Sequence, residues 1–81
     1  MGDSWEVGWS HSGLWSLHQL PWREAARVDE ALLRFAATGE GAVAVVRHDP
    51  AGIRLHVPPF VVRLTLDREA GTMTVWWIFR R

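Results

Sequence analysis

The sequence contains no cysteine, which excludes both a disulfide bond and a thiolate metal site. It also contains no lysine: nine arginines are balanced by nine acidic residues, so the formal net charge is zero. A neutral chain has no overall field that would draw it to nucleic acid or to a membrane surface. No apolar run approaches the roughly 18 residues of a membrane-spanning helix, and the start of the chain is acidic, unlike a signal peptide. We therefore expect a soluble, cytoplasmic protein.

The residues that are present fit one small globular domain. Of 81 residues, 48% are hydrophobic and 22% are charged, a balance typical of a folded domain and not of a disordered tail. A chain of this length forms at most one domain, which we expect to span residues 1–81. Six tryptophans without a tyrosine are an unusual aromatic composition. Those in the first third of the chain either pack between a strand and helices, which is the simpler explanation, or form part of a groove for a partner.

The first half of the chain predicts one strand and two helices. Apolar residues alternate over 5–9, which predicts a short strand. Ser10 or Ser12 is a suitable N-cap for a short helix, which Pro21 ends. A second, amphipathic helix follows, and Gly39 is placed to end it. The apolar side chains of this second helix recur at steps of three and four residues: Ala25, Val28, Leu32 and Phe35.

The second half of the chain predicts four strands. The strands are separated by short turns rich in Asp, Pro and Gly, and short turns favour antiparallel pairing because a parallel pair needs a long crossover. The expected strands are Ala42–His48, Ile53–Val57, Phe60–Leu66 and Thr72–Phe79. The predicted fold class is α+β, in the order β-α-α-β-β-β-β, with a mostly antiparallel sheet and two N-terminal helices packed on one face.

Strand register can be tested against hydrophobicity, because a shift of one residue moves every side chain to the opposite face. The simplest register pairs the strand ends that flank each turn: His48 with Ile53, Val57 with Phe60, and Asp67 with Thr72. One face is then entirely apolar, and we expect it to lie under the helices. Its members are Ala44, Val46, Leu55, Val57, Phe60, Val62, Leu64, Val75, Trp77 and Phe79.

The opposite face carries an unusual row of basic residues in this register. Its first row is Arg47, Arg54, Arg63 and Trp76; its second is Val45, His56, Val61 and Ile78; and Thr65 is paired with Thr74. Like charges directly opposite one another destabilise a sheet. Either the guanidiniums spread into water and stack on apolar neighbours, or they bind an anion such as a phosphate or a partner's carboxylate. Arginine beside an aromatic residue also suits single-stranded nucleic acid.

The four histidines do not predict a metal site. His11 and His18 are separated by ~10 Å along a helix, too far for one ion, and His56 faces an apolar residue in the predicted register. No metal or cofactor is therefore expected. An imidazole can give and take a proton near neutral pH, which makes His56 a candidate for proton transfer on the arginine row. A solvent-facing histidine without a catalytic role is the simpler alternative.

Short motifs in a fixed order carry a family resemblance. The early ones are Val7-Gly8-Trp9-Ser10, Leu17, Leu20-Pro21, Val28, Ala31-Leu32 and Phe35-Ala36. The later ones are residues 53–57, Phe60-Val61-Val62, Asp67, Ala70-Gly71-Thr72, Val75 and Arg80-Arg81. Over nearly its whole length the chain thereby resembles the RelE/ParE toxin superfamily. The resemblance implies a small sheet with two N-terminal helices on one face, and the toxin half of a bacterial type II toxin–antitoxin pair.

The resemblance also implies an activity and its residues. RelE-like members cut messenger RNA on the ribosome without metal, ParE-like members poison DNA gyrase, and a cognate antitoxin neutralises both by covering the toxin. Arg54 matches a basic catalytic position, Arg81 matches the C-terminal arginine, and His56 stands where a basic residue is common. These three are the expected catalytic residues of a metal-independent mRNA endoribonuclease. The expected contacts to nucleic acid or a partner are Arg47, Arg54, Arg63, Trp76 and Arg80.

Some positions depart from the family pattern. Val61 replaces an arginine, Leu64 replaces a tyrosine, and the chain stops at Arg81, before the position of a downstream catalytic tyrosine. Arg63 is the candidate replacement for the missing charge. In the predicted register Arg81 has the parity of the core face. It therefore reaches the site only if the strand ends or bends after Phe79. If it does not, Arg80 is the alternative arginine for the site.

Three other functions stay open on the sequence. A ParE-like gyrase poison needs none of the missing catalytic groups. A toxin-fold module without catalysis would bind an acidic, antitoxin-like peptide on the arginine and tryptophan face. Self-association through two Trp76 faces around a two-fold axis is the third, and it is disfavoured because facing arginine rows repel each other.

Overall fold

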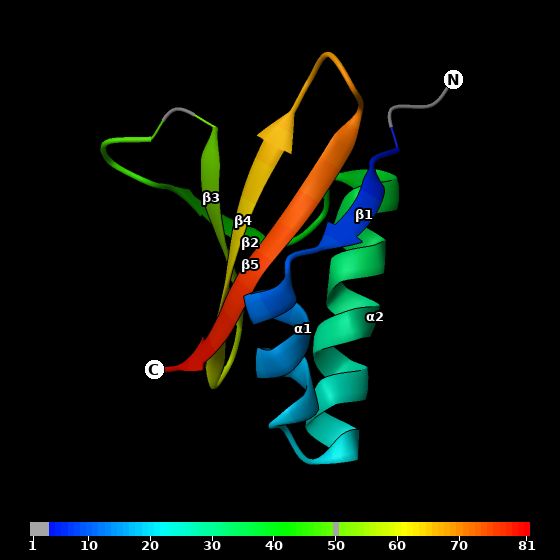
Figure 1. Cartoon of the computed structure of the whole chain (residues 1–81), viewed down its shortest axis with the longest axis vertical. Coiled ribbons are helices and arrows are strands. Elements are labelled where there is room, and N and C mark those ends of the chain that lie inside the picture. Colours follow the sequence, from blue (N-terminus) through cyan, green and yellow to red (C-terminus); the bar gives the residue numbers. More distant parts are fainter. Residues whose placement is uncertain (1–3, 50) are drawn as a thin grey trace.

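The computed structural model describes residues 4–49 and 51–81 as an α+β fold with two helices and a five-stranded mixed sheet (Figure 1). The elements are β1 (Glu6–Trp9), α1 (His11–His18), α2 (Trp22–Thr38), β2 (Ala42–Val45), β3 (Gly52–Val57), β4 (Phe60–Asp67) and β5 (Thr72–Arg80). The predicted order of strands and helices is confirmed.

The strands lie in the order β1-β5-β4-β3-β2. Strands β2 to β5 form the predicted antiparallel meander. Strand β1 pairs with β5 in parallel, so the first strand of the chain is placed beside the last one. Helices α1 and α2 lie next to each other on one side of the sheet (Figure 1), and no helix of residues 4–49 and 51–81 covers the other side.

Both helices begin and end as their local sequence requires. The Ser10 side chain accepts a hydrogen bond of 2.9 Å from the backbone N–H of Gly13, so Ser10, and not Ser12, is the N-cap of α1. Helix α2 follows Pro21 and ends at Gly39, whose φ of 77° is the left-handed conformation that glycine adopts without steric cost. Helix α2 is thereby a continuous 17-residue element with one apolar face.

The hydrophobic core lies between that apolar face and the sheet. From α2 it takes Val28, Leu32, Phe35 and Ala36; from the strands it takes Leu55, Val57, Phe60, Val62, Leu64, Met73, Val75 and Ile78. Most of the face predicted to lie under the helices is therefore confirmed for β3, β4 and the first half of β5. The two exceptions are β2 and the second half of β5.

The predicted register of β2 is wrong. Val45, and not His48, pairs with Ile53, and the strand ends at Val45. The chain then turns earlier than expected: the Asp49 carboxylate accepts the N–H of Ala51 at 3.2 Å, and the N–H of Gly52 donates to the Asp49 carbonyl at 2.9 Å. Residues 42–46 are all apolar, so hydrophobicity alone did not distinguish between the two faces of this strand.

The register of β5 is correct only up to Val75. Leu64 pairs with Val75, but the next residue, Arg63, pairs with Trp77, because a β-bulge interrupts the β4–β5 ladder there. The start of α1 is bonded to the bulge, since the Ser10 N–H donates to the Val75 carbonyl at 3.0 Å and the Ser10 hydroxyl donates to the Trp76 carbonyl at 3.2 Å.

The bulge exchanges the faces of all later residues of β5. Ile78 is 8% exposed and belongs to the core, whereas Trp77 and Phe79 are 44% and 40% exposed. The prediction that Trp77 and Phe79 lie under the helices is therefore wrong. The reason is physical: an isoleucine fills the space under the helices, and the larger aromatic rings are left on the open side of the sheet.

Candidate nucleic-acid interface

The side of the sheet away from the helices carries the candidate site. We call this side the arginine face and define it by Arg54, His56, Val61, Arg63, Thr65, Trp76, Trp77 and Phe79. Two rows of paired residues cross it: Ala44–Arg54–Arg63–Trp77 and Ala42–His56–Val61–Phe79. The predicted pairings of Arg54 with Arg63, His56 with Val61, and Thr65 with Thr74 are confirmed.

Arg54 and Arg81 meet at one end of this face. They line a hollow of about 300 Å³ together with Val61, Phe79 and Arg80, which we call the arginine hollow. Arg81 is held there because its N–H donates to the Pro59 carbonyl at 2.9 Å. The bulge is the cause of this proximity, because without it Arg81 would have the parity of the core face. The sequence-based expectation that Arg81 has the parity of the core face is therefore wrong.

The charges of Arg54 and Arg81 are not used within the described part of the chain. Arg54 and Arg81 are both exposed, and the salt bridges in residues 4–49 and 51–81 belong to Arg63 and Arg80. Two exposed guanidiniums at the rim of one hollow, with the Phe79 ring beside them, have the chemistry to bind an anion that carries a flat apolar group.

Arg80 belongs mainly to the helix side of the sheet. It pairs with Phe60, its guanidinium lies 5.0 Å from the centre of the Phe60 ring, and one of its nitrogens lies 3.4 Å from the Glu24 carboxylate of α2. Although Arg80 also lines the arginine hollow, its charge is engaged elsewhere. The Arg80 guanidinium is therefore less available for contact with a partner than the Arg81 guanidinium.

Arg63 is partly neutralised on the arginine face. Its terminal nitrogen lies 3.2 Å from the Asp49 carboxylate, and the side chains of Arg63 and Asp49 are 24% and 37% exposed. The Arg63 Nε is buried and has no hydrogen-bond partner in the described structure. Asp49 thus offsets the repulsion expected between Arg63 and the directly opposite Arg54.

Of the other predicted site residues, His56 and Trp76 lie on the arginine face and Arg47 does not. Arg47 is exposed in the turn after β2 and is not part of the row, so its predicted pairing with Arg54 is wrong. His56 is half-buried on the arginine face, two residues from Arg54 on β3. Trp76 is 41% exposed, and its indole N–H donates to the Thr65 hydroxyl at 2.7 Å. The predicted position of Trp76 on the open face is confirmed.

Two aromatic members of the arginine face were missed from the sequence. Strict alternation from Val75 onward predicts that Trp77 and Phe79 lie in the core. The signal that identifies them is the unbroken apolar run at 75–79, which strict alternation does not explain and a bulge does.

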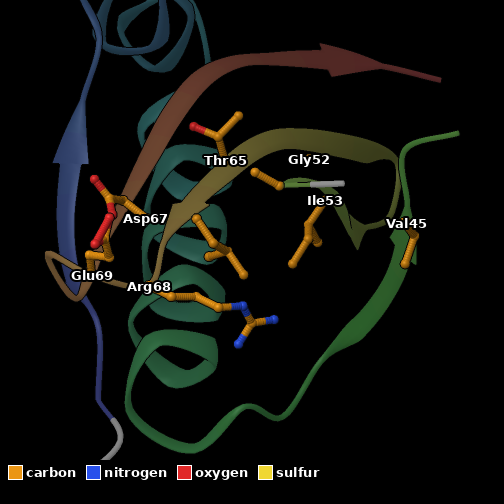
Figure 2. Close-up of a pocket in the computed structure, with 9 residues that line it drawn as sticks. Val45, Gly52, Ile53, Thr65, Asp67, Arg68 and Glu69 are labelled. Atoms are coloured by element: carbon orange, nitrogen blue, oxygen red, sulfur yellow. The ribbon is translucent and has the colours of Figure 1, made fainter. Parts of the chain in front are cut away.

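A larger hollow lies away from the arginine hollow, between the ends of the β2–β3 and β4–β5 hairpins (Figure 2). It has a volume of about 660 Å³, and its walls include Val45, Ile53 and Leu66. In Figure 2 the Arg68 side chain reaches from the β4–β5 turn toward Ile53 and Val45. This hollow contains none of the residues predicted to be catalytic, so it does not define the site.

The described residues also limit the other site types. Within 4–49 and 51–81, no cluster of three or more His, Asp or Glu side chains has the geometry to hold a metal ion. Neither helix of this part of the chain has the length and apolar character needed to cross a membrane.

No protein-family model and no curated protein matches the sequence, whereas solved structures match the fold. A chain of the RelBE2 toxin–antitoxin complex from Mycobacterium tuberculosis superimposes with a TM-score of 0.84 at 18% sequence identity, over 96% of this chain and 92% of that one. A chain of the RelB–RelE antitoxin–toxin complex from Methanococcus jannaschii gives a TM-score of 0.68 at 11% identity, over 93% and 91%. The helix pair and five-stranded sheet described above are thus the fold of a chain found in RelBE toxin–antitoxin complexes.

Proposed function

We propose that this chain is a single RelE/ParE-like domain and the toxin of a bacterial type II toxin–antitoxin system, which inhibits translation by RelE-like, ribosome-dependent cleavage of mRNA. One observation carries the proposal: the bulge in β5 brings the exposed Arg54 and Arg81 together at a hollow that also contains Phe79. The fold shared with chains of RelBE complexes supports the same assignment.

The arginine hollow fits the chemistry of RNA cleavage. In this reaction the ribose 2′-oxygen forms a bond to phosphorus, the bond from phosphorus to the 5′-oxygen breaks, and the leaving oxygen takes up a proton. Negative charge builds up on the phosphate oxygens in the transition state, and Arg54 and Arg81 would stabilise it. His56, ~6.6 Å along the strand from Arg54, is the candidate acceptor for the 2′-hydroxyl proton. No step in this scheme needs a metal or a cofactor.

The cognate antitoxin is the expected protein partner. A segment of the antitoxin with acidic and apolar side chains would complement the exposed arginines and the aromatic rings of the arginine face. Covering this face would block access of mRNA to Arg54 and Arg81, which is how binding would neutralise the toxin. A partner seated only on the helices would leave both arginines accessible.

A second candidate, a ParE-like gyrase poison or a binding module without catalysis, is favoured by one observation. Arg63, the expected substitute for the arginine missing at Val61, is paired with Asp49 and contributes little free charge. Binding to gyrase or to an antitoxin-like peptide needs the contact surface of Trp76, Trp77 and Phe79 but not a full catalytic set.

Induced expression of the chain in a bacterial host distinguishes these functions. We expect growth arrest, with new 5′ ends in translated mRNAs within minutes of induction and no DNA breaks. Mapping of RNA ends by primer extension and of gyrase-dependent DNA breaks in the same cells provides the measurement. DNA breaks without mRNA cleavage would assign the gyrase function, and unimpaired growth with intact mRNA would contradict the toxin proposal.

A further inference from the structure

A second hollow lies on the arginine face, next to the arginine hollow. It has a volume of about 270 Å³ and is lined by Asp49, Arg63, Thr65, Trp76 and Trp77; we call it the indole hollow. Val61 lines the arginine hollow, while Arg63 and Thr65 line the indole hollow. These three residues follow one another on the same face of β4 at intervals of ~6.6 Å. The two hollows are therefore consecutive along the strand.

Two aromatic rings line the indole hollow, and one of them is held by a hydrogen bond. The bulge places two successive tryptophans on the same side of the sheet, where 41% of Trp76 and 44% of Trp77 is exposed. Trp76 is held in orientation because its indole N–H donates to the Thr65 hydroxyl at 2.7 Å. An aromatic surface that is half open to solvent is suited to stacking against a planar ring.

The polar groups of the indole hollow include both a donor and an acceptor. The Arg63 side chain is 24% exposed, so its guanidinium can donate to a ligand in the hollow, although its Nε–H is itself buried. The Asp49 carboxylate binds the Arg63 guanidinium with one oxygen and the Ala51 N–H with the other, and 37% of its side chain is still exposed. A planar ligand with a donor and an acceptor on its edge would pair with the exposed parts of the Asp49 carboxylate and the Arg63 guanidinium.

We propose that the indole hollow binds an unpaired nucleobase of the RNA strand whose phosphate lies between Arg54 and Arg81. This inference rests on the proposed function, since the RNA is held at the arginine hollow. Nucleobases combine the required features: a planar aromatic face, and an edge that carries hydrogen-bond donors and acceptors. The sugar–phosphate backbone alone has no aromatic ring to stack, and a lipid chain has no polar edge to pair with Asp49 and Arg63.

The inference is tested with two fluorescently labelled RNA oligomers of six nucleotides, one intact and one with the same backbone but no bases. Fluorescence anisotropy at low salt measures the affinity of each for the full chain. We expect the intact oligomer to bind about tenfold more tightly, the range expected for stacking of one base. Trp77→Ala should remove most of this difference without changing the affinity for the abasic oligomer, and Trp77→Phe should keep most of it. Trp15→Ala, on a helix, is the control.

Failure of the inference and failure of the proposed function give different results. Equal affinity for both oligomers, with both weakened by Arg54→Ala, would overturn the base-binding role and leave the phosphate site intact. Binding of neither oligomer, or binding insensitive to Arg54→Ala, would overturn the proposed RNA function and the base-binding role with it. If an acidic peptide that contains tryptophan occupies the indole hollow and neither RNA oligomer displaces it, the hollow belongs to a protein partner. That result would contradict the inference.

Discussion

Replacing Arg54 by alanine is expected to lower the rate of mRNA cleavage by about 10²–10³-fold, the usual effect of removing one group that stabilises transition-state charge. Arg54 is exposed and forms no salt bridge in the described residues, so its guanidinium is free to bind the phosphate. Primer extension on mRNA incubated with ribosomes and purified protein gives the rate. Arg54→Lys should lie in between, because lysine keeps the charge but loses the two-pronged donor geometry.

The variant should stay folded, which separates a lost charge from a lost structure. Arg54 lies directly opposite Arg63, so its removal relieves like-charge repulsion and should not lower the unfolding midpoint. Arg23→Ala is the matched control, because Arg23 is an exposed arginine that stacks on Trp22 in α2, on the helix side. Wild-type cleavage by Arg54→Ala, or an equal loss in Arg23→Ala, would contradict the catalytic role.

The largest effect on stability from a single methyl group is expected at Gly13. Gly13 is buried where α1 crosses β5, and a Cβ placed there would lie 2.9 Å from the carbonyl carbon of Val75 and closer still to its oxygen. Both are backbone atoms, so the clash is relieved only by moving the helix away from the strand. Against a gain of ~1 kcal/mol in helix propensity, we expect Gly13→Ala to lose about 2 kcal/mol net, within the range for overpacked sites.

This loss is large for a chain of 81 residues, whose total stability is on the order of 4–12 kcal/mol. Urea denaturation followed by tryptophan fluorescence provides the measurement. The matched control is Gly8→Ala, because a Cβ at Gly8 meets only the Met73 carbonyl oxygen, at 3.9 Å. A Gly13→Ala protein as stable as the wild type would show that α1 does not pack on β5 as described.

The elements and most of the core were predictable because strong local signals and global packing agree for them. The periodicity of α2, its glycine end, and the clean alternation of β3 and β4 each allowed one interpretation. The pairing of Arg54 with Arg63 followed, since the turn between Val57 and Phe60 fixes their register. Six of the eight residues of the arginine face were therefore accessible from the sequence, and Trp77 and Phe79 were not.

The errors of the prediction come from two segments without a distinctive alternation. Strand β2 is apolar on both faces, so its register is set by hydrogen bonds in the turn at Asp49, which removed Arg47 from the predicted row. Residues 75–79 are apolar throughout, and the bulge there is fixed by contacts to Ser10, more than sixty residues earlier in the chain. Neither contact is visible in a local pattern.

The bulge determines the composition of the candidate site. It moves Trp77 and Phe79 from the predicted core to the arginine face and brings Arg81 beside Arg54. The departures from the expected family pattern at Val61 and Leu64 are thus accompanied by a different local arrangement of charge and aromatic rings. This arrangement forms both hollows of the arginine face.

The most direct test of this account is an NMR titration of the ¹⁵N-labelled protein with a short single-stranded RNA, following the indole N–H signals of its six tryptophans. Trp15 and Trp22 on the helices are 62% and 74% exposed, more than Trp76 and Trp77, so nonspecific contact would perturb them first. We predict that the signals of Trp76 and Trp77 shift, while those of Trp15 and Trp22 stay in place. Shifts confined to Trp15 and Trp22 would contradict the assignment of RNA binding to the open face of the sheet.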